Sequence, residues 1–317
     1  MSGSYVVQYY KNDSSRMLTS FGASGFLYND DRHLRIQGNQ VFHHFCIIDQ
    51  QTGQPVARCT FFQQSSRWYS PFSAPFGSLE CTILLPGQVL DALIERIESE
   101  MRTLAIDAVS VKQPPDCYAP EQTTLFMERL LKKGFRITSA PVVYYLPVTS
   151  DDLRTRMAAQ EVRRLQKSER AGFTFRQLTE LQPDQVIAYW QQRRAEQRYP
   201  LTIAPEQLRL LLTEMPDRFP VFVVESDGEW AAMSVCVRVS ASILYHFLPV
   251  DTGRYRSVSP MVMLIHGLYQ YCQQQGIRLL DLGVSLDDHR QPKPGLIRFK
   301  RNMGGLPSPK LSFEKWL

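Results

Sequence analysis

The chain has 317 residues, of which 44% are apolar and 21% charged, and its formal net charge at pH 7 is +5. This composition is typical of a folded globular protein with a sizeable core, and at ~100–200 residues per domain the length indicates two domains. The small positive charge permits an anionic partner such as a phosphate-bearing cofactor, but a protein built to bind nucleic acid is usually more basic.

Neither a signal peptide nor a membrane span is expected. Residues 1–15 lack the basic segment and apolar core of a signal peptide, and the chain has no run of about 18 apolar residues. The six cysteines form no C-x-x-C pair and mostly fall in apolar strand or helix patterns. Because this usage is typical of buried thiols in a reducing compartment, we expect a cytoplasmic protein.

The first half of the chain has the pattern of one α/β unit. Alternating apolar residues predict a hairpin at 42–64 and a third strand from residue 67. Apolar residues at helical spacing then predict a helix with one buried face at 88–104. The remaining predictions are a strand, a helix and a closing strand, at 106–113, 123–134 and 140–148.

The second half repeats this order of elements. A hairpin is predicted at 219–239, with its turn at Asp227-Gly228, and residues 151–215 before it have helical patterns. After the hairpin we predict a strand, an apolar helix, a strand, a short helix and a last strand, at 242–250, 261–276, 277–285, 295–305 and 309–317. The repeat predicts two α/β (α+β) domains, at 1–149 and 150–317, each a mixed, mostly antiparallel sheet flanked by helices.

This order of elements, taken twice, resembles the GNAT acyltransferase fold (GCN5-related N-acetyltransferases) in tandem. The stretches "YQYCQQQGIRLLDLGVSLDDH" and "PGLIRFKRNMGG" are similar to the end of the FemABX-type transferases and FemAB-like acyltransferases. Those proteins end with a helix, a glycine, a strand carrying Asp and Gly, and a Gly-Leu-x-x-Phe-Lys-x-x-x-Gly-Gly helix. The basic stretch "EVRRLQKSERAGFTF" is similar to the helix that opens their second domain.

The resemblance implies acyl transfer to an amine, with acyl-CoA as the donor in the broad superfamily and aminoacyl-tRNA in FemABX proteins. In this fold two parallel strands splay apart and their exposed backbone groups pair with the donor's extended arm. Those strands would be 242–250 and 277–285, which places Leu248 and Gly283 in the donor site. The first domain would then hold the acceptor, a small-molecule or peptide amine.

The loop "DTGRYRSVSP" would meet the donor's phosphates, because helix N-termini present N–H groups to anions. Arg254 and Arg256 would neutralise phosphate, and Ser257 and Ser259 would donate hydrogen bonds or cap the helix. Acyl-CoA users of this fold usually carry Arg/Gln-x-x-Gly-x-Gly/Ala here, and this loop retains only Gly253, which favours the FemABX-like subgroup. The matching loop of the first half, "SAPFGSLECTILLPG", has no basic residue, so we expect no phosphate site there.

Lys300, Asp281 and His289 are the candidate catalytic residues. The resemblance assigns Lys300 to stabilising charge on the donor or the reacting carbonyl; the alternative is a solvated lysine near a helix C-terminus. Asp281 lies among apolar residues, where a carboxylate is either paired structurally or used in a site. His289 is a candidate base in a polar loop with Asp287, but this composition is more typical of a plain solvated loop.

Candidate substrate contacts come from both halves. Tyr245 and His246 alternate on one strand and so face opposite sides of the sheet, with one of them facing the cleft, and Asp287 lies in the loop after the next strand. Tyr69 and Phe72 in "RWYSPFSAPFGS" would line the acceptor groove, although the stretch also fits a kinked edge strand.

Two further features concern tRNA binding and metal binding, and neither is favoured. Arg163 and Arg164 belong to a basic helix that would touch tRNA phosphates, but such runs are more often solvated faces, so tRNA is not favoured. His43 and His44 have no third ligand at a metal-binding spacing, and no metal is expected.

Three functions therefore stay open. The first is an N-acyltransferase using acyl-CoA, which positions donor and amine and stabilises the oxyanion with backbone N–H groups and Lys300. The second is an aminoacyl-tRNA-dependent aminoacyltransferase acting on a peptide or cell-wall precursor. The third is a non-catalytic binding protein with a GNAT fold. A V-shaped opening between strands 242–250 and 277–285 favours an enzyme, whereas side chains filling that space favour the binding protein.

Overall fold

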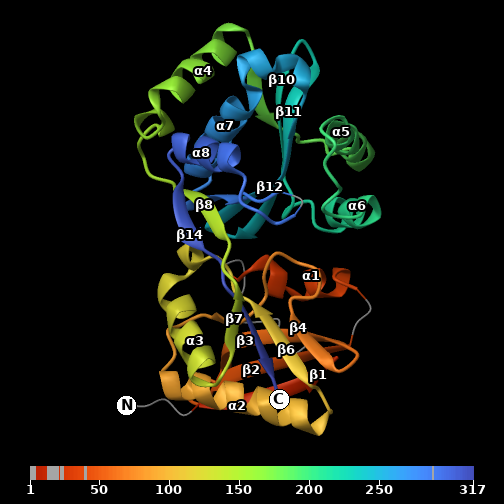
Figure 1. The fold of residues 1–317 in the computed structure, drawn as a ribbon, viewed down its shortest axis with the longest axis vertical. Coiled ribbons are helices and arrows are strands. Elements are labelled where there is room, and N and C mark those ends of the chain that lie inside the picture. Colours follow the sequence, from red (N-terminus) through yellow and green to blue (C-terminus); the bar gives the residue numbers. More distant parts are fainter. Residues whose placement is uncertain (1–4, 13–20, 22–24, 39–40, 288) are drawn as a thin grey trace. The chain divides into compact units, whose positions relative to one another are not determined.

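The computed structural model describes residues 5–12, 21, 25–38, 41–287 and 289–317. The chain divides into two compact units, one made of Met1–Pro141 with Ser308–Leu317 and the other of Val142–Pro307. Each unit contains one mixed sheet with helices packed against it (Figure 1).

The first unit contains the sheet β1-β2-β3-β4-β6-β15-β7, with β5 paired to β3. The strands β4 and β6 run parallel, and the other pairs of this sheet are antiparallel. Its strands are β1 (Tyr5–Lys11), β2 (Val41–Asp49), β3 (Gln54–Gln64), β4 (Arg67–Ser70), β5 (Glu80–Cys81), β6 (Ala108–Lys112), β7 (Arg136–Ser139) and β15 (Ser312–Trp316). Its helices are η2 (Leu27–Asn29), α1 (Asp31–Ile36), α2 (Gly87–Thr103), η3 (Asp116–Tyr118) and α3 (Pro120–Lys132).

The second unit contains the sheet β14-β8-β13-β12-β11-β10-β9. Here β12 and β13 run parallel, while β13–β8, β12–β11, β11–β10 and β10–β9 are antiparallel. Its strands are β8 (Val142–Pro147), β9 (Thr174–Gln177), β10 (Val221–Ser226), β11 (Glu229–Ser240), β12 (Ile243–Asp251), β13 (Leu279–Val284) and β14 (Leu306–Pro309). Its helices are η4 (Leu153–Thr155), α4 (Ala159–Arg170), α5 (Pro183–Glu196), α6 (Pro205–Glu214), η5 (Gly253–Val258), α7 (Pro260–Gln274) and α8 (Pro294–Asn302).

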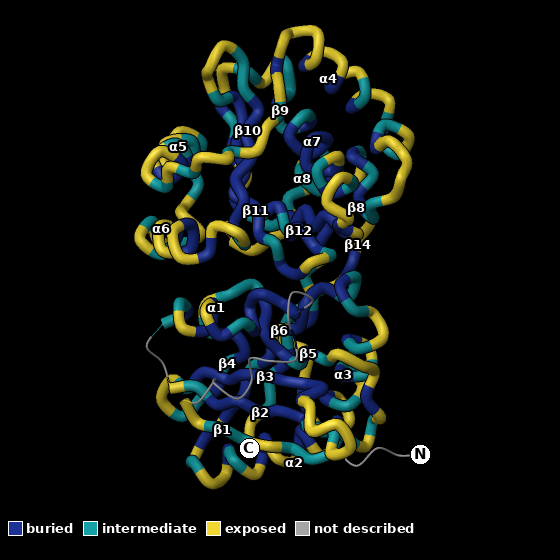
Figure 2. The backbone as a smooth tube through the Cα atoms, turned by 180° about the vertical axis from the view of Figure 1, so that it is seen from behind, coloured by how far each residue is buried: buried dark blue, intermediate teal, exposed yellow. Residues whose placement is uncertain are grey.

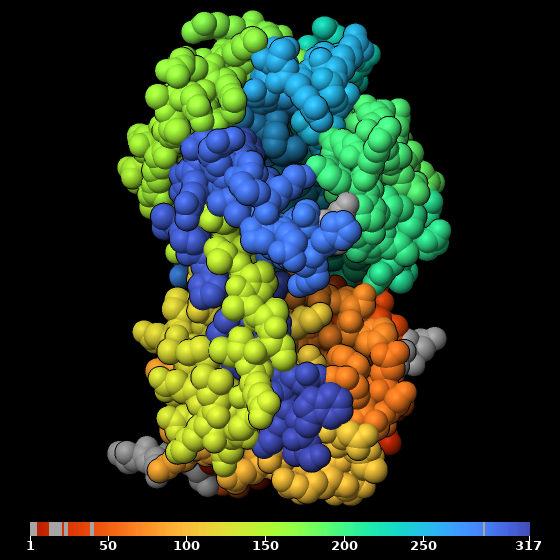
Figure 3. Space-filling model, viewed as in Figure 1, coloured from red at the N-terminus to blue at the C-terminus, as the bar shows by residue number. Residues whose placement is uncertain are grey.

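The two sheets exchange a strand relative to the continuous halves 1–149 and 150–317. The strand β8 follows the first repeat but pairs with β13 in the second unit. The strand β15 ends the chain but lies between β6 and β7 in the first unit; its atoms are the dark blue group among yellow-green and orange atoms in Figure 3. Apolar alternation predicts that both segments are strands, but it carries no information about which sheet each one joins.

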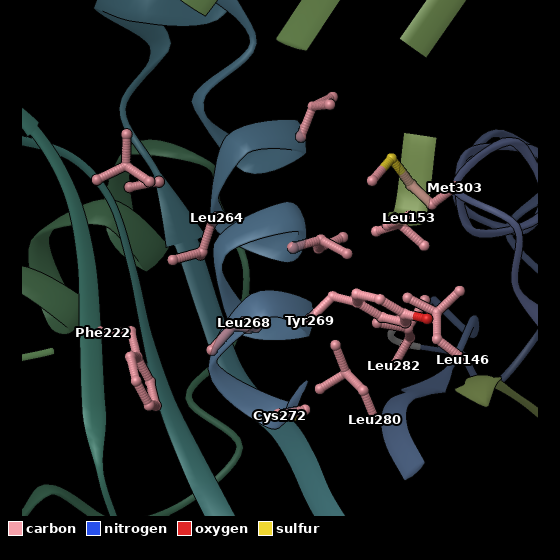
Figure 4. Packing of buried hydrophobic residues seen from close by; sticks show 14 of the residues in the cluster. Leu146, Leu153, Phe222, Leu264, Leu268, Tyr269, Cys272, Leu280, Leu282 and Met303 are labelled. Atoms are coloured by element: carbon pink, nitrogen blue, oxygen red, sulfur yellow. The ribbon is translucent and has the colours of Figure 1, made fainter. Parts of the chain in front are cut away.

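The helix α7 forms the centre of the second unit's core because it is covered on several sides. Figure 4 shows Leu268 on the side of α7 that faces Phe222 of β10, and Tyr269 pointing toward Leu146 of β8. The apolar character of α7 nearly all round its axis follows from this burial. In Figures 1 and 2, α5 and α6 lie on the other side of the strands from α7.

The cysteines and the paired histidines occupy ordinary core and strand positions. All six cysteines are free thiols, four of them buried and two half-buried. His43 hydrogen-bonds Tyr9 Oη at 2.8 Å and Gln63 Oε1 at 3.0 Å, and His44 hydrogen-bonds Thr60 Oγ1 at 2.8 Å. Among the described residues, no group of three or more His, Cys, Asp or Glu side chains is placed to hold a metal ion, and no helix has both the length and the apolar content needed to cross a bilayer.

The substitution Gly267→Ala tests the packing of α7 on the sheet. A Cβ at Gly267 would overlap the ring of Phe175, which stacks on Phe222 with centroids 5.6 Å apart. We expect the free energy of unfolding to fall by about 1–3 kcal/mol, because the core must shift to admit a methyl group. Denaturant titration measures this change. The matched control is Gly295→Ala in α8, where a Cβ meets nothing within 4 Å and stability should hold or rise; equal effects of the two variants would contradict the packing.

Candidate active site

The parallel strands β12 and β13 pair over only three residues and then part. The pairs are Ile243↔Leu279, Leu244↔Leu280 and Tyr245↔Asp281. Beyond them β12 continues along β11 to Asp251, and β13 continues along β8 to Val284. We call this divergence, formed by residues 246–251 of β12 and 282–284 of β13, the fork.

The matching strands of the first unit do not diverge. There β4 and β6 stay paired to the last residue of β4, where Ser70 lies opposite Val111. The third pair is Tyr69↔Ser110 in the first unit and Tyr245↔Asp281 in the second. Among the residues that the structure describes, the parallel strands therefore separate in the second unit and stay paired in the first.

A bulge at Gly283 takes β13 away from β12. The register between β13 and β8 shifts between Asp281 and Val284, and Gly283 has φ +74°. A Cβ at Gly283 would lie 3.1 Å from Cε2 of Tyr245. This position therefore requires glycine for its backbone conformation and for the approach of the Tyr245 ring.

Two oppositely charged side chains bind the peptide groups of Gly283. Its N–H donates to Asp281 Oδ1 at 2.6 Å. Its carbonyl accepts from Lys300 Nζ at 2.8 Å, and the carbonyl of Val284 accepts from the same nitrogen at 2.6 Å. Lys300 thus reaches the β13 side of the fork from α8, and an ammonium with three N–H donors keeps one for a further acceptor.

Burial sets the charge states around Lys300. The Lys300 side chain is buried, which lowers its pKa to about 8, while the Asp281 carboxylate acts in the opposite direction. On β12, burial lowers the pKa of His246 to about 3, and the charge of Lys300 lowers it further in the same direction. His246 is therefore a neutral imidazole at pH 7, and its buried Nε2 has no hydrogen-bond partner among the described residues. Burial, together with Asp281, also raises the pKa of Tyr245 well above its usual range, so that its phenol keeps its proton.

The loop expected to meet phosphate lies at the far end of β12. At the usual rise per residue of a β-strand, this end lies about 20 Å from Tyr245. Arg254 is exposed and pairs with Glu229 at 2.7 Å. Arg256 and Ser257 are also exposed.

The end of this loop begins α7, and the predicted donor residue on β12 is inside the core. Ser259 is the N-cap of α7, with φ +54° and no side-chain capping bond. Leu248 is buried opposite Val235 of β11, so only its backbone is available to a donor.

Comparison with known proteins agrees with this geometry. Residues 154–300 match the family model described as Acetyltransferase (GNAT) domain, and this stretch lies wholly in the second unit. The crystal structure of FemX is similar over 93% of both chains, with a TM-score of 0.72 and 11% identity. The chain is a tandem GNAT-fold protein. The predicted fold, two GNAT-like domains in tandem as in a FemABX-like protein, is thus confirmed.

Two further solved structures are similar to this chain. A tandem GNAT protein from the clavulanic acid biosynthesis pathway is similar over 98% of both chains, with a TM-score of 0.54 and 11% identity. The structure of L-PGS from Bacillus licheniformis is similar over 89% of this chain and 85% of that one, with a TM-score of 0.56 and 15% identity. No curated protein matches the sequence.

The polar loop after β13 is organised by Asp287. Its carboxylate accepts from the backbone N–H of His289 at 2.9 Å and of Gln291 at 2.8 Å. Its own N–H donates to the Gln291 carbonyl at 2.8 Å. The Asp287 side chain therefore folds its own loop, and His289 is exposed on it; Asp288 lies outside the described residues.

Tyr69 and Phe72 lie in the first unit of the GNAT tandem, whereas Lys300 lies in the second. Tyr69 is half-buried on β4. The backbone N–H of Phe72 donates to Gln37 Oε1 at 3.2 Å, and its ring lies 6.1 Å from that of Phe62. Both residues are next to Phe62 of β3, Tyr69 through the strand pairing and Phe72 through its ring.

Two residues near the fork had no signal in the sequence. Gln197, at the end of α5, donates from Nε2 to the carbonyl of Asp251 at 2.9 Å and to its Oδ1 at 3.0 Å. Tyr199 hydrogen-bonds Lys293 Nζ, which also lies 4.3 Å from the centre of the Tyr199 ring. These contacts tie the α5–α6 loop to the end of β12 and to the start of α8. They lie in irregular segments, where neither period nor motif marks a residue.

The burial of Lys300 predicts a pH-dependent stability. The folded pKa of about 8 lies below the ordinary lysine pKa of 10.5, so between these values the unfolded chain binds a proton that the folded chain has lost. The free energy of unfolding should therefore rise with pH across this window, by about 3 kcal/mol relative to that of Lys300→Met. Below pH 8 the penalty for burying the charged lysine is fully present. Urea unfolding of both proteins at several pH values measures this. A difference in stability that stays constant with pH would contradict the assignment.

Proposed function

We propose that this protein is an N-acyltransferase that moves an acyl group from an acyl-CoA donor to an amino group, with the donor bound by the second unit. The observation that carries the proposal is the fork, which opens beside Lys300 in the second unit, while the first unit keeps β4 and β6 paired. The match of residues 154–300 to a GNAT domain supports placing the donor in this second unit. Because acyl-CoA donors are used inside the cell, we also propose that the protein acts in the cytoplasm.

The donor's extended arm would pair with the edge of β12 that has no ladder partner on β13 beyond Tyr245, among the described residues. Backbone hydrogen bonds of this kind hold an extended ligand as an added strand does. The arm would lead from the η5 loop, where Arg254 and Arg256 are available to phosphate, to the bulge at Gly283. The backbone of β12, rather than buried side chains such as Leu248, would do the binding.

The reaction would take place where Lys300 meets Gly283. At neutral pH Lys300 is mainly a cation, and its remaining N–H would stabilise the oxyanion formed when the amine attacks the thioester carbonyl. A buried cation that is already in place stabilises this charge without reorganising solvent. Collapse of the intermediate would break the C–S bond and release the thiolate, which takes up a proton.

His246 would orient the amine rather than act as the final base. With its proton on Nδ1, the free Nε2 can accept a hydrogen bond from the amine. A pKa of about 3 makes the imidazole too weak a base to hold the amine's proton, which would pass to water. His289, exposed on the loop that Asp287 folds, stays a candidate base at the C-terminal end of β13.

We place the amine acceptor on the first unit. Its parallel strands leave no fork for a donor arm, and the loop after β4 carries no cation for phosphate. Tyr69 and Phe72 would contact the acceptor there.

A second candidate function is aminoacyl transfer from aminoacyl-tRNA. The outer face of α4 is exposed along its length (Figure 2) and carries Arg163, Lys167 and Arg170. Arg164 is less available, because it pairs with the buried Glu161 at 2.9 Å. The similarity of the fold to FemX supports this alternative. The divergence of the strands at Lys300 favours either enzyme over a non-catalytic binding protein.

Turnover with acyl-CoAs of increasing acyl length tests the first proposal. We expect Lys300→Met to lower kcat by roughly 10²–10³-fold, because it removes a preorganised oxyanion donor, with a smaller effect on the Kd for CoA. Lys167→Met, on the exposed face of α4, is the matched control and should retain full activity. Thermal unfolding of each variant separates loss of chemistry from loss of fold. No turnover with any acyl-CoA, or undiminished kcat in Lys300→Met, would refute the proposal.

The tRNA alternative makes a separate prediction about salt. If α4 contacts phosphates, the pair of substitutions Arg163→Gln and Lys167→Gln should make the slope of log K against log salt concentration shallower by roughly 1–2, because fewer counterions are released. Filter binding or fluorescence anisotropy with aminoacyl-tRNA at several salt concentrations measures the slope. An unchanged slope, or tight CoA binding without any tRNA affinity, removes this alternative.

A further inference from the structure

A buried glutamine holds the loop that follows β4 in the first unit. Gln37 is the C-cap of α1 and is only 3% exposed. Its Oε1 accepts hydrogen bonds from the backbone N–H groups of Phe72, at 3.2 Å, and of Ser73, at 3.1 Å. In both ribbon views α1 lies beside β4, on the side of the sheet away from α2 (Figures 1 and 2). One side chain therefore fixes two consecutive peptide groups in a segment that belongs to neither a helix nor a strand.

These two bonds decide how the Gln37 amide is oriented. A backbone N–H group only donates, so the atom that accepts from both of them is the amide oxygen. The Nε2 atom then donates to the Tyr28 carbonyl at 3.4 Å and to Nδ1 of His33 at 3.3 Å. Both polar atoms of the amide thus have partners, and a buried amide that is matched in this way holds its neighbours in one arrangement.

The ends of the loop are closed without help from Gln37. The backbone N–H of Ser78 donates to Ser70 Oγ at 2.8 Å. A Cβ at Gly77 would lie 2.7 Å from the same oxygen, so the chain approaches itself closely there. What Gln37 adds is therefore the conformation of the part between the two ends, and not the closure of the loop.

The loop carries Phe72 into an aromatic wall formed by Phe42, Phe62, Tyr69 and Phe72. Phe62 lies opposite Phe42 of β2 and Tyr69 of β4, so these three side chains share one face of the sheet. Phe62 is buried, and its ring centre lies 6.3 Å from that of Phe42 and 6.1 Å from that of Phe72. Phe42, Tyr69 and Phe72 are half-buried around it. The wall therefore presents partly exposed rings, which are suited to contact with a flat apolar group.

We propose that Gln37 is a positioning residue for the amine acceptor, and that the aromatic wall takes a flat apolar part of that amine. The inference rests on the proposed function, which places the acceptor on the first unit. Gln37 acts through the loop: without its oxygen, the N–H groups of Phe72 and Ser73 lose their acceptor, and the loop must move to satisfy them. The Phe72 ring then leaves its place beside Phe62, and the amine loses one side of its binding surface.

Steady-state kinetics with acetyl-CoA as the donor, and with phenethylamine or ethylamine as the acceptor, tests this role. We expect Gln37→Leu to raise the KM for phenethylamine about tenfold while kcat and the KM for acetyl-CoA stay the same, because the lost contact is common to the ground state and the transition state. The KM for ethylamine, which has no flat apolar part, should not change. Gln37→Glu keeps an oxygen for both N–H groups and should restore most of the lost affinity.

Two further variants keep the test decisive. Phe72→Ala alters a half-buried residue and should raise the KM for phenethylamine as well, so it replaces Gln37→Leu if that variant fails to fold. The matched control is Gln51→Leu in the exposed β2–β3 turn, which should keep the kinetics of the unaltered protein. Hydrogen–deuterium exchange, followed by mass spectrometry, should be faster in Gln37→Leu for the peptide that contains Phe72 and Ser73.

The results that overturn the inference differ from those that overturn the proposed function. An unchanged KM for phenethylamine in Gln37→Leu, an equal rise for both amines, or unchanged exchange at Phe72 and Ser73 refutes the role of Gln37 alone. Turnover of ethylamine without turnover of phenethylamine refutes the flat apolar acceptor. Absence of turnover with every amine and acyl-CoA refutes the proposed acyl transfer, and this inference with it.

Discussion

The divergence of β12 and β13 depends on how one peptide unit is held. At Gly283, β13 leaves the ladder, and its N–H and carbonyl are bound by Asp281 and Lys300 respectively. Backbone groups that leave a sheet inside a protein are costly unless other partners satisfy them. Here the partners carry opposite charges, so the bulge is bonded on both sides and each charge has a counter-charge nearby. Lys300 thus stabilises the bulge at which β13 leaves β12. The same contacts hold its charge close to His246 of β12.

Comparison of the two units shows which residues accompany the change from paired to diverging parallel strands. In the first unit, the third pair of the parallel strands holds Ser110, and β4 stays paired with β6 to its last residue. In the second, that position holds Asp281, and Gly283 follows two residues later with a positive φ. A carboxylate and a glycine at this spacing are what a bulge with a bonded N–H requires, and no such pair follows Ser110. Specialisation of the units for different roles is consistent with this local difference.

Much of the fold was predictable because order and periodicity survive in the sequence and predict two similar α/β units, while the GNAT fold was expected from the resemblance. The exchange of β8 and β15 was not predictable, because a strand's pattern fixes which face is buried and not which neighbour it pairs with. At the site, the Phe-Lys helix and the Asp-x-Gly strand led to Lys300, Asp281 and Gly283, which the structure brings together. The role of Asp287 in folding its own loop and the α5–α6 loop contacts depend on tertiary neighbours, which no local pattern records.

A single strand connects the fork with the loop that we expect to meet phosphate. β12 carries His246 at the fork and leads, at its other end, into Thr252 and the η5 loop. Because β12 pairs with β11 from Ile243 to Asp251, with shifts in the register, the separation of these two places is fixed by strand geometry and not by a flexible linker. A donor that engages both must therefore match a set distance. Under the proposed function, this fixed separation would select donors by length as well as by chemistry, although the loop lacks the usual glycines.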